Sequence, residues 1–103
     1  MQGDLRDLIG VDRVVHEPAR LLILALLSEA ECADFLYLLR QTGLTKGNLG
    51  AHLTRLEDAG YVAIDKGYHG KVPQTMCRMT QVGRAALHRY RAQMQHALEL
   101  LPQ

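Results

Sequence analysis

The sequence predicts a mostly helical α+β fold, a winged helix-turn-helix with a two-stranded wing and a long C-terminal helix. Three observations carry this prediction. Apolar residues recur at helical spacing over residues 17–60, and a glycine-bearing turn separates two of those helices. A β-prone segment with glycines and a proline at its centre follows at 61–79. A last amphipathic stretch covers 80–101.

The length of 103 residues is close to the commonest domain size, so we expect one domain over 1–103. Residues 1–15 are expected to form an N-terminal arm or a short helix broken near Gly10. The longest uncharged apolar run, Leu21–Leu27, is much too short to span a bilayer, and charged side chains interrupt residues 1–10. We therefore expect a cytoplasmic protein without membrane contact.

Residues 17–60 are predicted to form the helical core. Pro18 suits the first turn of the first helix, where its missing N–H is not needed. A second helix is expected over 31–42. Gly43 can adopt the positive φ that ends this helix, and Thr45 can cap the next one. Two amphipathic helices joined by so short a turn are typical of a helix-turn-helix.

The third helix, over 45–59, has one apolar stripe formed by Leu49, Leu53 and Leu56. At 3.6 residues per turn, these side chains fall within roughly 60° of the helix circumference. The helix therefore packs on the core along this stripe and leaves its other side free. Small and hydrogen-bonding residues occupy that free side: Gly47, Asn48, Ala51, Thr54, Arg55 and Asp58. Such a surface suits a helix that lies in the major groove of DNA.

The free side of this helix supplies predicted contacts to DNA. Arg can form two hydrogen bonds with guanine and Asn two with adenine, so Asn48 and Arg55 are the predicted base readers. Lys46, in the first turn, is expected to reach a phosphate. His52 lies beside the buried stripe, so it either stacks on the core or contacts DNA. The predicted DNA-binding residues of this helix are Thr45, Lys46, Gly47, Asn48, Ala51, His52, Thr54 and Arg55.

Residues 61–79 are predicted to form a hairpin, with strands at 61–65 and 74–79 and a flexible tip between them. Cationic or protonatable side chains occur at Lys66, His69, Lys71 and Arg78. A hairpin with a basic tip can touch the phosphate backbone or enter the minor groove, so these four residues join the predicted DNA-binding set.

Net charge is only +1, but the charges are unevenly distributed along the chain. Residues 1–65 contain six Lys or Arg and ten Asp or Glu. Residues 66–98 contain six Lys or Arg, three His and no acid. This segment predicts one basic region that can attract phosphates. The alternative is a solvated basic helix without a ligand.

Residues 80–101 are predicted to form a helix, capped by Thr80 and ended by Pro102, that is longer than one small core needs. Its apolar stripe is expected to pair with the same helix of a second copy. The predicted dimer interface consists of Val82, Ala86, Tyr90, Met94, Ala97 and Leu101. The alternative is that the helix folds back on its own domain.

No constellation of catalytic residues is visible. Ser28 is the only serine and has no histidine at a useful spacing, and the hairpin glycines do not lie between a strand and a helix as in a phosphate-binding loop. Cys32 and Cys77 lack partners at metal-ligand spacing, so two buried free thiols are expected, the alternative being a disulfide between them. His88 and His96 are expected to face solvent, the alternative being a metal site shared by two subunits. We predict no enzyme, no metal and no cofactor.

Five stretches of the sequence occur in a characteristic order: residues 16–21, 42–49, 52–53 together with 56–62, 70–75 and 79–84. Through them the chain resembles the small single-domain winged-helix transcriptional regulators related to the MarR and ArsR groups. The resemblance implies a homodimer that binds double-stranded DNA as a sequence-specific transcriptional regulator. The recognition helix at 45–59 would enter the major groove and the wing at 66–73 would lie on the backbone.

The chain departs from this family at three positions. Gly50 stands where the family often has a Ser that can meet a phosphate. Asp34 and Leu36 stand where the metal-sensing members carry cysteines, so metal sensing of that type is not expected. A small-molecule effector is compatible with the resemblance, but no residue cluster specifies one. The alternative function is a winged-helix protein-interaction module without DNA binding.

Overall fold

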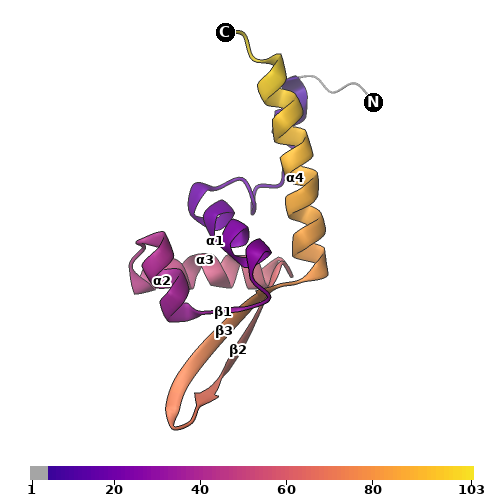
Figure 1. The fold of residues 1–103 in the computed structure, drawn as a ribbon. Coiled ribbons are helices and arrows are strands. Elements are labelled where there is room, and N and C mark those ends of the chain that lie inside the picture. Colours follow the sequence, from indigo (N-terminus) through magenta and orange to yellow (C-terminus); the bar gives the residue numbers. More distant parts are fainter. Residues whose placement is uncertain (1–4) are drawn as a thin grey trace.

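The computed structural model describes residues 5–103 and places a helical layer against a small antiparallel sheet (Figure 1). The elements in chain order are η1 (a 3-10 helix, Leu5–Gly10), α1 (Pro18–Glu29), β1 (Ala33–Asp34), α2 (Phe35–Thr42), α3 (Lys46–Asp58), β2 (Val62–His69), β3 (Val72–Met79) and α4 (Gln81–Leu100). The predicted mostly helical winged fold is confirmed. Residues 1–4 of the expected N-terminal arm lie outside the described residues.

The molecule is elongated, with principal extents of 54 × 25 × 21 Å. In Figure 1 the hairpin of β2 and β3 projects from one end and α4 rises toward the other, with η1 beside its upper half. The helices α1, α2 and α3 lie between these two projections. The elongation follows from the chain itself, because a long hairpin and a long helix leave a small core in opposite directions.

The predicted helix ends of the core are confirmed by their capping bonds. Gly43 has φ of 71° and ends α2, which matches the left-handed conformation expected of it. The Thr45 hydroxyl accepts a hydrogen bond from the Asn48 N–H at 3.1 Å and caps α3. At the start of α1, the Glu17 carboxylate accepts from the Arg20 N–H at 2.8 Å. These local bonds fix where α1 and α3 begin and where α2 ends.

The sheet has three strands in the order β1-β3-β2, where the sequence predicted two. The additional strand β1 pairs with β3 through Ala33 opposite Cys77 and Asp34 opposite Met76. The predicted helix over 31–42 accordingly begins later, at Phe35, because Asp34 accepts the Tyr37 N–H at 2.7 Å and caps it. A two-residue strand is too short to produce a recognisable alternation in the sequence.

The hairpin strands are longer than predicted, and its tip is correspondingly short. The pairing continues to His69 opposite Val72, so only Gly70 and Lys71 form the turn. Gly70 has φ of 66°, a conformation that other residues rarely adopt. Residues that were expected in a flexible tip, Lys66 among them, therefore lie in paired strands with fixed faces.

The first turn of α4 is fastened closely to the start of β2. The Thr80 N–H donates to the Tyr61 carbonyl at 3.0 Å, and the Thr80 hydroxyl donates to the Gly60 carbonyl at 2.6 Å. Gly83, one turn into the helix, lies so close that an added Cβ would stand 2.2 Å from the Tyr61 carbonyl oxygen. Only glycine permits this contact, which gives a physical reason for a glycine inside the helix.

Much of the apolar stripe of α4 packs against its own chain. Ala86 and Tyr90 are 1% and 7% exposed and belong to the core of their own chain, and Ala97 is also buried. Met94 packs against the same core. These side chains are thus largely covered within their own chain, and their place in a dimer interface stays a prediction.

The two ends of the predicted α4 interface, Val82 and Leu101, are exposed. The amphipathic pattern indicated that one face of α4 is covered. That face packs against η1 and the core of the same chain. This is the alternative in which the helix folds back on its own domain.

The two cysteines are free and differ in exposure. Cys77 is fully buried on β3, and burial raises the pKa of its thiol to about 11. Cys32 is exposed, so the expectation that both thiols are buried was wrong for it. Cys32 precedes a strand of only two residues, and that short edge leaves its side chain in solvent.

We predict that Gly83→Ala destabilises the fold by about 2 kcal/mol or more, because the new methyl group would overlap the Tyr61 backbone. Gly50→Ala is the matched control: no heavy atom lies within 4 Å of its added Cβ, so the higher helix propensity of alanine should stabilise α3 by about 1 kcal/mol. Urea unfolding of both variants measures the difference. Equal effects of the two substitutions would contradict the close contact.

We also predict that a thiol reagent modifies Cys32 rapidly and Cys77 only when the chain unfolds. The reactive species is the thiolate, which burial and the raised pKa disfavour at Cys77. The measurement is the kinetics of labelling at neutral pH with and without denaturant. Cys32→Ser should abolish the fast phase; a fast phase that persists in this variant would contradict the prediction.

Candidate DNA interface

Helix α3 presents the free side that the sequence predicted. Leu49, Leu53 and Leu56 are buried. The residues predicted to contact DNA are exposed with one exception, His52: Thr45, Lys46, Gly47, Asn48, Ala51, Thr54 and Arg55 face solvent. The helix is therefore anchored along one stripe and available for binding on the remainder of its circumference.

The exposed side of α3 has two flanks, which follow from 100° of rotation per residue. Asn48, Ala51 and Arg55 fall on one flank. Gly50, Thr54 and Glu57 lie on the other and line a hollow toward the wing. The two predicted base readers thus share a flank, on the side away from the wing.

The hollow between α3 and the wing has a volume of about 630 Å³. Apolar side chains, including those of Phe35, Leu53 and Ile64, form its inner wall. Polar groups at its rim come from both elements: Thr54 and Glu57 from α3, and Lys66 and Thr75 from the wing. A convex ligand that touches α3 can thus reach the wing as well.

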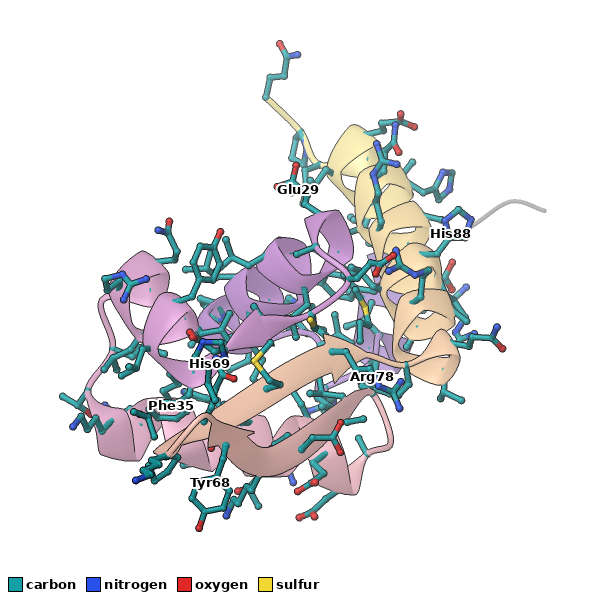
Figure 2. The ribbon with its side chains drawn as sticks, turned by 60° about the horizontal axis from the view of Figure 1, so that its bottom comes forward. Glu29, Phe35, Tyr68, His69, Arg78 and His88 are labelled. Carbon is teal, nitrogen blue, oxygen red and sulfur yellow. The ribbon has the colours of Figure 1, made fainter. Side chains whose placement is uncertain are left out.

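The wing carries its predicted cationic residues on different faces. Residues directly opposite in an antiparallel pair share a face, so Lys66, Tyr68, Thr75 and Pro73 lie on the face toward the hollow. His69 and Arg78 belong to the opposite face, and Lys71 sits in the turn. Figure 2 shows Tyr68 near the wing tip and Arg78 at the other end of the sheet, near α4.

Tyr68 is a candidate contact that the sequence interpretation missed. Its side chain is 74% exposed although it is aromatic, and it shares a face with Lys66. The ring can pack on a sugar and the hydroxyl can donate to a phosphate. The signal available in the sequence was its spacing of two from Lys66 in a strand, which the expectation of a flexible tip concealed.

His52 points toward α1 rather than straight into solvent. Its Nδ1 lies 3.2 Å from an Arg20 Nη and 3.9 Å from Glu17 Oε1. The ring is half-buried, with its side chain 23% exposed. Of the two positions that the sequence left open, the structure places His52 at the boundary between the core and the free side.

The model of the family described as "Winged helix DNA-binding domain" matches residues 19–98, which extend from α1 to nearly the end of α4. The chain belongs to this winged-helix family. The uncharacterized protein MJ0432 of Methanocaldococcus jannaschii is 36% identical over 78 residues, which are 76% of this chain and 85% of that protein.

Solved structures share the winged-helix fold. A transcriptional regulator homologue from Pyrococcus horikoshii has a TM-score of 0.84 and 25% identity, over 92% of this chain and 94% of that one. A PadR family regulator from Eggerthella lenta has a TM-score of 0.65, with 23% identity over 91% and 88% of the two chains. An ArsR family regulator has a TM-score of 0.59, with 22% identity over 99% and 100%. The PadR and ArsR structures share the winged-helix fold with this chain.

The basic segment of this winged-helix domain does not form one surface. Lys66 and Lys71 lie on the wing, whereas Arg84, Arg89 and Arg91 are exposed on α4. Figure 1 shows these two elements projecting in opposite directions. The sequence prediction of one basic region was therefore wrong, because a continuous segment passes from one end of the molecule to the other.

Neither a metal cluster nor a membrane span occurs among the described residues. No group of three or more His, Cys, Asp or Glu in residues 5–103 could hold a metal ion. His88 is exposed, and His96 is half-buried with its Nε2 unpaired. None of the helices in the same range is long and apolar enough to cross a bilayer.

Proposed function

We propose that this winged-helix domain is a cytoplasmic, homodimeric, sequence-specific DNA-binding transcriptional regulator. Helix α3 enters the major groove, and the wing lies on the adjacent backbone. The observation that carries the proposal is the exposed side of α3, with Asn48 and Arg55 on one flank and Lys66 across a hollow from the other. The family match and the similarity to solved transcriptional regulators support it.

Base reading falls to Asn48 and Arg55. They are seven residues apart, so two helical turns bring their side chains onto the same flank with small Ala51 between them. Small neighbours let the helix approach the base edges, to which Arg and Asn can each form two hydrogen bonds. Gly47, which is exposed beside this flank, permits the same close approach.

The phosphate contacts come from several elements. Thr45 and Lys46 stand at the N-terminal end of α3, where the helix dipole also favours an anion. Lys66, Lys71 and Tyr68 belong to the wing. His69 and Arg78 face away from the hollow, so a contact from either needs DNA that bends around the wing.

A second copy would dock on the apolar end formed by η1 and the end of α4. Leu5 and Ile9 of η1 are exposed there, and so are Leu98 and Leu101 at the end of α4. η1 packs along α4, so these side chains belong to one end of the molecule (Figure 1). A two-fold dimer through this end would present two copies of α3 to half-sites roughly 34 Å apart.

The rival function is a winged-helix protein-interaction module without DNA binding. A single basic surface would have argued against this rival. The basic residues are instead divided between the wing and α4, so a direct experiment has to decide. The chain is incubated with a random pool of double-stranded DNA at fixed salt, and bound sequences are selected and read. Enrichment of one motif with two-fold symmetry supports the regulator; a pool that stays random after repeated selection would favour the rival.

We predict that Arg55→Ala weakens binding to the selected site by roughly 1–3 kcal/mol and relaxes specificity at one base position, because a two-bond contact to guanine is lost. Lys71→Ala should weaken binding to every sequence alike and lower the salt dependence by about one unit. Titrations on matched and mismatched sites at several salt concentrations separate the two effects. Equal losses on all sites would remove Arg55 from the base readers.

We predict that the chain sediments as a dimer at micromolar concentration and that Ile9→Glu or Leu98→Glu shifts it to monomer. A charge buried in an apolar interface is unfavourable by several kcal/mol. Leu36→Glu is the matched control, since Leu36 is 55% exposed on α2, outside the proposed interface. A wild-type chain that sediments as a monomer would contradict the two-half-site arrangement.

A further inference from the structure

Arg20 of α1 joins the recognition helix to the segment that precedes α1. Its Nε donates to the Val14 carbonyl at 2.6 Å, and one Nη donates to the Arg13 carbonyl at 3.3 Å. Its other Nη lies 3.2 Å from His52 Nδ1. One planar guanidinium therefore reaches two backbone acceptors and one side chain of α3.

The contact with Arg20 decides which ring nitrogen of His52 carries the proton. A guanidinium has only donors and does not lose its charge in proteins. His52 Nδ1 must therefore accept, and a ring that accepts at Nδ1 carries its hydrogen on Nε2. The geometry defines a neutral ring in one tautomer.

The same Nδ1 of His52 has a second neighbour, since Glu17 Oε1 lies 3.9 Å from it. A protonated ring could turn its Nδ1–H to that carboxylate. However, 3.9 Å exceeds hydrogen-bond distance, and Glu17 Oε1 already accepts the Arg20 N–H at 2.8 Å. The observed distances favour the bond from Arg20.

The other ring nitrogen of His52, Nε2, is available to a ligand. Nε2 has no hydrogen-bond partner among residues 5–103 and is not among the buried unpaired atoms of that range. His52 lies four residues after Asn48 and three before Arg55, so the three are neighbours on the surface of α3. An N–H donor on this ring thus stands beside the two base readers.

We propose that Arg20 is a positioning residue that holds His52 as the Nε2–H tautomer, and that this N–H donates to a DNA phosphate beside the major groove. The second part rests on the function proposed above. His52 then contributes a directed hydrogen bond without a net charge. Arg20 itself touches no DNA and acts through the ring.

Arginine is needed for this role because of its shape. The three acceptors lie around one side of α1 and are reached by three different nitrogens of the guanidinium. A lysine has a single nitrogen on a flexible stem and cannot hold the same three directions. The Arg20→Lys substitution therefore keeps the charge while it removes the orientation of the ring.

The first experiment measures the tautomer of His52 in the free chain, by ¹⁵N NMR of the histidine rings at about pH 8, where ordinary histidines are neutral. Exposed His88, which Figure 2 shows projecting from α4, is the internal reference for an unconstrained ring. We expect His52 to carry its proton on Nε2 in the wild type and to become a mixture of tautomers in Arg20→Lys. An Nδ1–H ring, or the same mixture in both proteins, would overturn the positioning role.

The second experiment compares His52→Gln with His52→Asn on the selected DNA. The Gln amide extends about as far as Nε2 and keeps a donor there, whereas the Asn amide reaches only to the Nδ1 position. We expect about a tenfold loss of affinity for Asn, the size of one hydrogen bond to a charged acceptor, and a much smaller loss for Gln. Equal losses would overturn the contact.

Salt dependence supplies an additional readout. A neutral donor releases no counterion, so His52→Asn should weaken binding without changing the salt slope. A slope that falls as for Lys71→Ala would mean a charged ring and would overturn the proposed tautomer in the complex. Arg13→Gln, which removes a nearby exposed charge, is the control for Arg20→Lys.

The two proposals fail separately. If the wild-type chain selects no DNA, the proposed function and the phosphate contact both fail, while the tautomer of His52 in the free chain still tests Arg20. If the chain selects a motif and His52 is not held as Nε2–H, only the positioning role of Arg20 fails.

Discussion

The contact between the first turn of α4 and the start of β2 is the constraint on which the shape of this protein depends. Gly83 lies against the Tyr61 carbonyl with no room for a side chain, and Thr80 donates two hydrogen bonds to Gly60 and Tyr61. The junction between β3 and α4 is thereby fixed against the start of β2. From that junction the wing extends one way and α4 the other, so the proposed DNA-binding surface and the apolar end lie at opposite ends of the molecule.

A second set of contacts converges on the segment between η1 and α1. Asp12 accepts the Val14 N–H at 2.9 Å and also the Tyr61 hydroxyl, a bond that raises the pKa of Tyr61. His16 Nδ1 lies 2.7 Å from the Tyr90 hydroxyl of α4. With Arg20 reaching the carbonyls of the same segment, these bonds tie it to β2, α4 and α3. The orientation of the recognition helix is thus set partly by residues far from it in sequence.

The sequence was sufficient to predict local structure wherever a pattern has only one physical interpretation. The leucine stripe of α3, its Thr45 cap and the left-handed Gly43 all follow from rules within one or two turns, and each is present. The stripe of α4 has two readings, because amphipathicity shows that a face is covered but not by which chain. Ala86 and Tyr90 are covered by their own domain. The placement of His52 beside Arg20 could not be predicted, since nothing in the sequence relates residues so far apart.

The distribution of charge has a consequence for how the protein would hold DNA. Each phosphate neutralised by Lys or Arg contributes roughly 0.9 to the salt slope. The exposed cations of α3 and of the wing beside the hollow are few: Lys46, Arg55, Lys66 and Lys71. Exposed Glu57 and Asp58 near the C-terminal end of α3 oppose a phosphate there. The arginines of α4 lie on the other projection and add little to this surface. A single copy therefore has weak non-specific attraction, and its discrimination must come from directed hydrogen bonds. In the proposed dimer, two copies on adjacent half-sites would double both contributions, which favours one site against the many competing sites of a genome.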